Sequence, residues 1–455
     1  MAPNFSFSSK TVLFFSAVWM IFSFYAVKTW REERFVWAHE MKSYYAYLPA
    51  SFVYHDIALE KTEMTTQNHD RFYAPQDGPV RGKILKTTMG LAFLQAPFFL
   101  TAHVYTKFTQ WPSDGFSQPY RKMVVFSALF YSFFGLFFIR KTLRLFFTDQ
   151  VVSLVLVTMF AGTNLYYYTL YEGAMSHVYS FFLISVFTYL TVSWHRVQSA
   201  WKLLLLGAVL GFITLIRPVN LCVSLFFLLY RDASQISYLD KFRLLFSKWK
   251  IILVAALLFF LVLLPQFAYW KYTSGHWLYY SYGAETFFWF RPKIWLGLFS
   301  YHKGWLVWTP IMWFAVVGIL FLRKKHKSLL LPVVISLVVY IYIIFCWWCW
   351  WYGGSFGMRA MIDVSAFLAI PLAAFFQYVL RTKIFSMPIL AIWVFLLALN
   401  LFQTHQYTAG KIHWAGTTKK VYWMMFINDY PEEEYSIFNQ EPNVEKAMQG
   451  ESGLD

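Results

Sequence analysis

Apolar runs of about 20 residues recur along this chain of 455 residues, separated by short basic clusters. A helical run of this length crosses the hydrocarbon core of a bilayer. Helices also satisfy their own backbone hydrogen bonds, as the lipid environment requires. The sequence therefore predicts an all-α polytopic membrane protein. The predicted spans are 11–30, 122–140, 149–169, 176–194, 201–216, 218–230, 250–270, 304–322, 328–350, 360–380 and 384–402.

Composition agrees with this class. The chain is 58% hydrophobic and only 14% charged, yet it carries a net charge of +16. In a soluble protein such a charge would suggest nucleic acid as a partner. Here most Lys and Arg residues lie between apolar runs, where they contact anionic lipid headgroups and set topology. We therefore expect membrane lipids as partners and no nucleic acid.

One further apolar run, 90–105, decides the orientation. If it spans, the basic clusters at 140–144, 231–250, 323–327 and 381–383 all face outward. If it lies flat in the interface, they face the cytoplasm together with the N-terminus, as positive charges in short loops do. The second arrangement predicts about eleven spans, a cytoplasmic N-terminus and an extracytoplasmic C-terminus, which for a bacterial protein means the plasma (inner) membrane.

The outer side then receives most of the unusual polar residues. We expect one transmembrane domain over 1–402, followed by a short extracytoplasmic tail over 403–455. The first outer loop, 31–121, is predicted to hold two juxtamembrane helices, at about 44–56 and 90–105, because their aromatic residues suit the headgroup level.

Three positions in this loop are candidates for function. Glu40 precedes Tyr44 and Tyr45 at the start of an aromatic amphipathic stretch. It is either a solvated loop carboxylate or a functional one held near the lipid surface. Lys83 and Lys86 lie in GKILKTTMG. They could meet a phosphate at the membrane surface or lipid headgroups.

Charges near the ends of the later spans are also candidates. Glu172 and His177 lie in a loop too short to carry a solvated carboxylate far from the bilayer. Arg217 interrupts an apolar stretch of some thirty residues, and Pro218 breaks the helix beside it. An ionisable residue at such a position marks a functional site by default. Broken helices at polar positions line cavities.

Two more motifs, YHKGW and WWYGGSFGMRAMID, lie at the outer ends of spans. They contribute His302, Lys303, Trp351, Tyr352, Arg359 and Asp363. Arg359 and Asp363 are four residues apart, so on an α-helix they would share a face and could pair. Alternatively, Arg359 binds a phosphate and Asp363 orients it.

These motifs together resemble the GT-C superfamily of membrane glycosyltransferases. The resemblance is carried by HEMKSYYAYLPASFVYHD, GKILKTTMGLAFLQAPFFLTAH, SDGFSQPY, LIRPVN and WWYGGSFGMRAMID, and it covers most of the chain. Within the superfamily it resembles the branch with the dolichyl-phosphate-mannose–protein mannosyltransferases and the aminoarabinose transferases and, more closely, a group of uncharacterised bacterial relatives. The resemblance implies a GT-C-like bundle with juxtamembrane helices in the first outer loop.

It also implies an inverting transfer of a sugar from a polyprenyl-phosphate donor to a lipid, glycan or protein acceptor. Glu40 takes the family's acidic position after the first helix and would act as base; Glu172 takes the second acidic site. Facing the departing phosphate would be the cations Lys83, Lys86, Arg217, Lys303 and Arg359. Substrate contacts would come from Tyr44, Tyr45, His177, His302, Trp351, Tyr352 and Asp363.

The family's first acid is most often Asp, whereas this chain has Glu40 beside His39. A divalent cation (Mg, Mn or Zn) held by His39, Glu40 and Glu172 is therefore an open alternative to metal-free catalysis. Two other functions compete: a transporter or flippase for a lipid-linked solute, and a ligase or polymerase of lipid-linked glycans. Against a transporter, the sequence shows no inverted repeat, and its polar residues gather toward one face.

Overall fold

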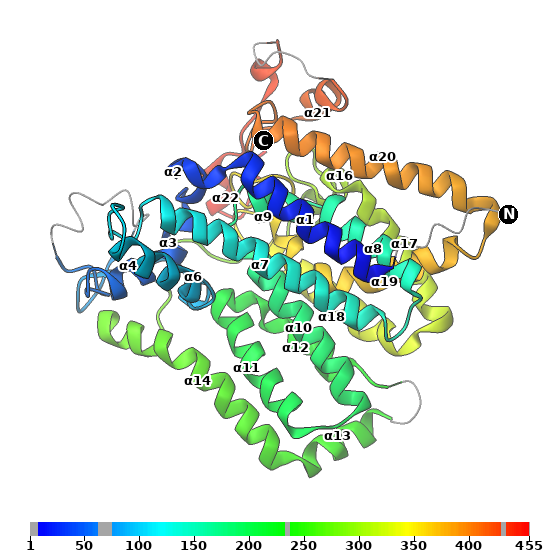
Figure 1. Cartoon of the computed structure of the whole chain (residues 1–455), viewed down its shortest axis with the longest axis horizontal. Coiled ribbons are helices and arrows are strands. Elements are labelled where there is room, and N and C mark those ends of the chain that lie inside the picture. Colours follow the sequence, from blue (N-terminus) through cyan, green and yellow to red (C-terminus); the bar gives the residue numbers. More distant parts are fainter. Residues whose placement is uncertain (1–7, 62–74, 233–236, 429–433, 455) are drawn as a thin grey trace.

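The computed structural model describes residues 8–61, 75–232, 237–428 and 434–454. Within them most of the chain is helical. The one sheet in this part is an antiparallel pair, β1 (Gln76–Asp77) and β2 (Lys83–Ile84). Figure 1 shows the long helices packed side by side, with the C-terminal segments gathered at one edge. The predicted all-α class is confirmed.

Six of the described helices are long and apolar enough to cross a membrane, and each coincides with a predicted span. They are α1 (Ser9–Val27), α7 (Gln118–Leu143), α10 (His177–Arg196), α14 (Trp249–Ser274), α18 (Lys327–Cys346) and α20 (Lys383–Thr408). These helices are compatible with a membrane-embedded protein.

The predicted count of about eleven spans is not confirmed, because five predicted spans are short or broken. Those at 201–216 and 360–380 form only α11 (Ala200–Ile216) and α19 (Ser365–Val379). The other three are divided into shorter pieces: the span at 304–322 breaks at Pro310, which cannot donate a helical hydrogen bond, and the span at 218–230 starts at Pro218 as a 3₁₀ helix. Their pieces are α8 (Asp149–Ala161) and α9 (Leu165–Leu170); η3 (Pro218–Val223) and α12 (Ser224–Leu229); and α16 (Trp305–Trp308), η4 (Pro310–Met312) and α17 (Trp313–Lys325).

Short elements connect the long helices. The predicted juxtamembrane segment 44–56 corresponds to α3 (Glu40–Tyr45) and α4 (Tyr47–Phe52), and 90–105 to α6 (Gly90–Lys107). Helix α6 is not among the six long apolar helices. The remaining connecting elements are η1 (Thr29–Arg31), α2 (Glu33–Val36), α13 (Tyr238–Ser247), α15 (Ile294–Phe299), η5 (Arg359–Ile362), α21 (Lys419–Met425), η7 (Ser436–Phe438) and α22 (Val444–Met448).

The contact between α11 and α14 depends on two glycines. Gly207 and Gly211, four residues apart on α11, face α14. A Cβ atom on Gly207 would lie 2.1 Å from the carbonyl oxygen of Ala255, and one on Gly211 would lie 2.9 Å from the Val262 side chain. Small residues with this spacing let two apolar helices approach closely. The glycines therefore set the distance between α11 and α14, which both lead to the cavity described below.

Two of the basic clusters lie at the same end of the bundle as the start of α1. The main-chain N–H of Ser9 donates to Asp149 at 2.7 Å, and Arg140 donates to the Ser9 hydroxyl at 2.8 Å. The ring of His326 packs 4.7 Å from that of Phe147. The helix ends that carry clusters 140–144 and 323–327 thus lie at the same end of the bundle as the start of α1. Which side of a membrane this end faces stays a prediction.

The C-terminal region folds back on the rest of the chain. Helix α20 continues to Thr408, so the predicted domain boundary at 402 falls inside a helix. Beyond it, Trp350 donates to the carbonyl oxygen of Ser452 at 2.8 Å, and Lys293 donates to that of Gly450 at the same distance. The described part of 403–455 is therefore docked against the segments that precede α15 and follow α18.

Candidate functional site

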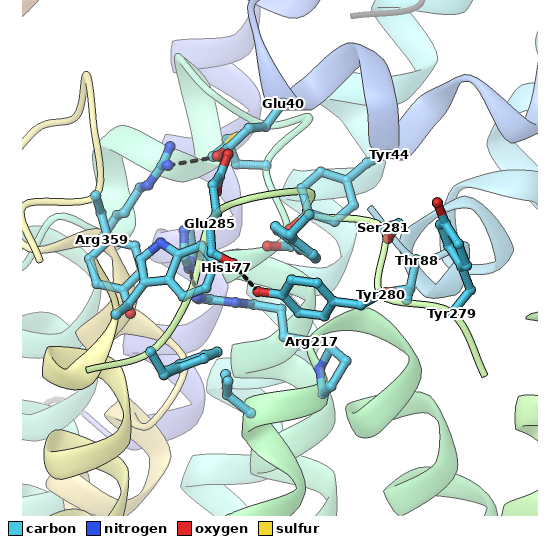
Figure 2. A pocket seen from close by; sticks show the side chains of 18 of the residues that line it. Glu40, Tyr44, Thr88, His177, Arg217, Tyr279, Tyr280, Ser281, Glu285 and Arg359 are labelled. Carbon is cyan, nitrogen blue, oxygen red and sulfur yellow. Dashed lines mark hydrogen bonds and ion pairs between the residues drawn. The ribbon is translucent and has the colours of Figure 1, made fainter. Parts of the chain in front are cut away.

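A cavity of about 1040 Å³, its open mouth included, lies where the ends of several helices meet. Its charged and imidazole groups are Glu40, His177, Arg217, Glu285 and Arg359, and aromatic rings form much of the remaining wall. Figure 2 shows these side chains converging from segments far apart in the sequence. The rings belong to Tyr44, Trp270, Tyr279, Tyr280, Tyr282, Phe287, Trp347 and Tyr352.

Glu40 is the first residue of α3 and is anchored on one side only. Its Oε2 accepts a hydrogen bond from Arg359 Nη2 at 2.8 Å, drawn as a dashed line in Figure 2. In the described part of the chain its other oxygen, Oε1, has no hydrogen-bond partner. Burial raises the pKa of Glu40, but the charges of Arg359 and Lys86 outweigh this effect and hold the pKa below its ordinary value. Glu40 is therefore an ionised carboxylate with a free oxygen in a cavity.

Arg217 reaches the cavity because α11 ends there. Its backbone is extended, and Pro218 follows as the first residue of η3. Nη1 donates to Asp363 Oδ2 at 3.0 Å and lies 3.1 Å from His177 Nδ1. Among the residues described, Nη2 and Nε of Arg217 have no acceptor. The guanidinium can thus donate two further hydrogen bonds to an anion in the cavity.

Asp363 lies outside the cavity lining and holds Arg217 and His177 in position. It is completely buried and accepts hydrogen bonds from His177, Arg217 and Asn220 at 2.7, 3.0 and 3.0 Å. The anticipated pairing of Asp363 with Arg359 does not form. Residues 359–362 adopt a 3₁₀ turn rather than an α-helix, so positions four apart do not share a face. Arg359 instead pairs with Glu40, and Asp363 pairs with Arg217.

Glu285 is a second carboxylate on the cavity wall that sequence reasoning missed. Its Oε1 lies 2.5 Å from Lys86 Nζ, and its Oε2 accepts a hydrogen bond from Trp348 Nε1 at 3.1 Å. A signal was available, since Glu285 is the only acidic residue between 271 and 303. Lys86 also influences Glu40, so four charges alternate in sign from Arg359 through Glu40 and Lys86 to Glu285.

Glu172 and Lys303 lie outside the cavity lining. Tyr167 donates to Glu172 at 2.8 Å, and the buried Lys303 donates to the carbonyl oxygen of Ser355. Burial raises the pKa of Glu172 and lowers the pKa of Lys303 to about 7. Both groups interact electrostatically with Arg359. Glu172 and Glu40 thus interact with the same arginine, but only Glu40 lines the cavity.

The other predicted residues divide between the cavity and structural contacts. Tyr44, His177 and Tyr352 line the cavity. The remainder have protein partners elsewhere: Lys83 pairs with Asp77 at 3.2 Å, Tyr45 donates to the Gly115 carbonyl oxygen at 2.5 Å, His302 lies 3.0 Å from the Gln440 carbonyl oxygen, and Trp351 is buried against Trp348 and Trp350.

The described residues contain no group of three or more His, Cys, Asp and Glu side chains placed to hold a metal ion. His39, Glu40 and Glu172 are therefore not brought together as the set considered from the sequence. Glu40 instead contacts Arg359, and Glu172 contacts Tyr167.

Comparisons with known proteins do not assign the chain to a family. No protein-family model matches the chain, and no curated protein is significantly similar to it.

Proposed function

We propose that the protein is a membrane glycosyltransferase of the GT-C type, which transfers a sugar from a polyprenyl phosphate to an acceptor hydroxyl in this cavity. The observation that carries the proposal is the position of Glu40. One oxygen is fixed by Arg359 and the other is free, while the donors of Arg217 face the same space. A carboxylate base and a phosphate-binding guanidinium in one cavity are the two groups that this reaction needs.

The transfer proceeds as a single displacement. The acceptor oxygen attacks the anomeric carbon, and the bond between that carbon and the phosphate oxygen breaks. The electron pair of the broken bond leaves with the phosphate, whose growing negative charge is stabilised by Arg217. The acceptor proton passes to Oε1 of Glu40. The low pKa of Glu40 keeps it ionised at neutral pH, as a proton acceptor must be.

The walls of the cavity offer surfaces for a sugar and for a polyprenyl chain. Tyrosine and tryptophan rings offer flat apolar faces for a sugar, with polar tips for its hydroxyl groups. Trp270 lines the cavity and belongs to α14, whose outward side chains Leu257, Phe260, Leu261 and Leu264 are 47–65% exposed. A polyprenyl chain in the bilayer can therefore lie beside α14 while its phosphate reaches Arg217.

We also propose the membrane in which the protein lies and its orientation there. The N-terminus and the basic clusters lie on the cytoplasmic side of a bacterial inner membrane, and the cavity and C-terminal region on the other. The acceptor, whether a lipid, a glycan or a protein, approaches the cavity from the extracytoplasmic side.

The test is Glu40→Gln, measured as release of polyprenyl phosphate from a panel of polyprenyl-phosphate-linked hexoses and pentoses in the presence of cell-envelope acceptors. We expect transfer to fall by roughly 100-fold or more, since general bases contribute about 10²–10⁴-fold, with donor binding retained. The matched control is Glu60→Gln, which removes a carboxylate of the same loop that pairs with the exposed Arg81. Full activity of the Glu40 variant, or transport of the donor with its glycosidic bond intact, would refute the proposal.

A further inference from the structure

Helix α13 carries an exposed apolar face. Leu239, Phe242 and Phe246 are 60%, 56% and 80% exposed. Their spacing of three and four residues places them on one side of the helix. Large apolar side chains gathered on one exposed face mark a surface for interaction.

The opposite side of α13 is firmly attached. Lys241 is 1% exposed, and its ammonium group donates to the carbonyl oxygens of Phe227, Leu228 and Tyr230 at 2.5, 2.9 and 2.7 Å. These carbonyls are at the C-terminal end of α12, where backbone acceptors lack helical partners. The orientation of α13, and with it the exposure of Phe242 and Phe246, is therefore set by this attachment.

The position of α13 relates it to a membrane surface. Helix α14 begins at Trp249, directly after α13, and Figure 1 shows the two joined at an angle. From Trp249 to the cavity residue Trp270, α14 rises about 32 Å at 1.5 Å per residue. The hydrocarbon core of a bilayer is about 30 Å thick. Helix α13 and the cavity thus lie at opposite surfaces of the same bilayer.

The charge around the exposed face is positive. Arg243 follows Phe242, and Lys248 and Lys250 flank Trp249, itself 54% exposed. Asp240, which pairs with Arg243 at 3.6 Å, is the only carboxylate between 237 and 250. An apolar face bordered by basic side chains is typical of helices that lie in the headgroup region of an anionic leaflet.

We propose that α13 is a binding site for anionic phospholipids, in the leaflet opposite the cavity. Leu239, Phe242 and Phe246 insert at the boundary between headgroups and acyl chains, while Arg243, Lys248 and Lys250 contact the lipid phosphates. This inference does not depend on glycosyl transfer and would hold for a transporter with the same cavity.

The experiment measures lipid retention by the purified full chain in detergent, using native mass spectrometry. The probes are dioleoylphosphatidylglycerol, which is anionic, and dioleoylphosphatidylcholine, which has no net charge. We expect the wild-type protein to retain the anionic lipid at a concentration roughly tenfold lower. Arg243→Gln/Lys248→Gln/Lys250→Gln should reduce this preference severalfold, and Phe242→Ser/Phe246→Ser should weaken retention of both lipids.

The matched control is Arg323→Gln/Lys324→Gln/Arg381→Gln, which removes the same charge from exposed positions away from α13. It should keep the preference. An unchanged preference in the α13 variant, or an equal loss in the control, overturns the proposal. Lys250→Gln alone, at an exposed position, should give a smaller loss in the same direction and replaces the triple variant should that variant unfold.

Discussion

Asp363 offers the sharpest test of the charge network behind the cavity. The carboxylate is completely buried, the Arg217 side chain is 13% exposed, and 3.0 Å separates their closest atoms. In Asp363→Asn the charge is lost, and an amide that itself donates hydrogen bonds meets the donors of Arg217 and Asn220. Removing one partner of a buried ion pair destabilises a protein by about 3–5 kcal/mol, because the other charge is left buried and unpaired. We expect a loss of this size from Asp363→Asn.

The double variant measures the interaction energy between Arg217 and Asp363 separately from the effect of each single substitution. Arg217→Gln alone should also cost about 3 kcal/mol, since it strands the buried carboxylate. In Arg217→Gln/Asp363→Asn no charge is left unpaired, so the combined loss should be smaller than the sum by about 2–3 kcal/mol.

The free energy of unfolding would be measured by denaturant titration of the purified protein in detergent micelles. Arg81→Gln/Glu60→Gln is the control cycle, because these side chains are 45% and 46% exposed and solvent screens their interaction. It should show little coupling. Additive losses in the Arg217–Asp363 cycle, to within about 0.5 kcal/mol, would refute the account of the network.

Three further predictions concern single side chains. The pKa of Lys303 is lowered to about 7 in the folded protein and is about 10.4 in the unfolded chain, so the folded state binds fewer protons between these pH values. The free energy of unfolding of the wild-type protein, compared with that of Lys303→Met, should therefore rise from pH 7 to pH 10. Parallel pH profiles of the two proteins would contradict this. Gly207→Leu should force α14 away from Ala255 and lower the melting temperature by several degrees more than Leu205→Ala, an exposed change on the same helix; equal shifts would argue against close packing. Glu285→Gln removes a negative charge from the cavity wall and should tighten binding of farnesyl phosphate severalfold in a titration, whereas weaker binding would show that Glu285 mainly positions Lys86.

Much of the site was open to prediction from residue type. A charge within or close beside a long apolar stretch is costly without a purpose, and this reasoning points to Arg217 and Glu172. Glu40 and Arg359 follow from their motifs and from the family resemblance. The cavity is lined by Glu40, Arg217 and Arg359 but not by Glu172. The same reasoning applied to 271–303 would have selected Glu285. Aromatic character also points to Tyr45 and Trp351, but it does not distinguish a cavity wall from a packed interior, and the fold buries both.

The number of full-length spans was not open to prediction in the same way. Apolar composition is the same in a continuous helix and in one interrupted after Ala161 or at Pro310, but only a continuous helix of about 20 residues crosses a bilayer. Hydropathy therefore located the segments correctly and overestimated how many are unbroken.

Sequence alone determined that this chain is an apolar, all-helical protein with its basic residues in the connections, because hydrophobicity and charge are local properties of each segment. The tertiary structure decided which charges meet. Arg359 pairs with Glu40, 319 residues away, and Asp363 pairs with Arg217, 146 residues away. An ion pair between distant positions depends on how helices pack and end, and no local pattern of residues records that.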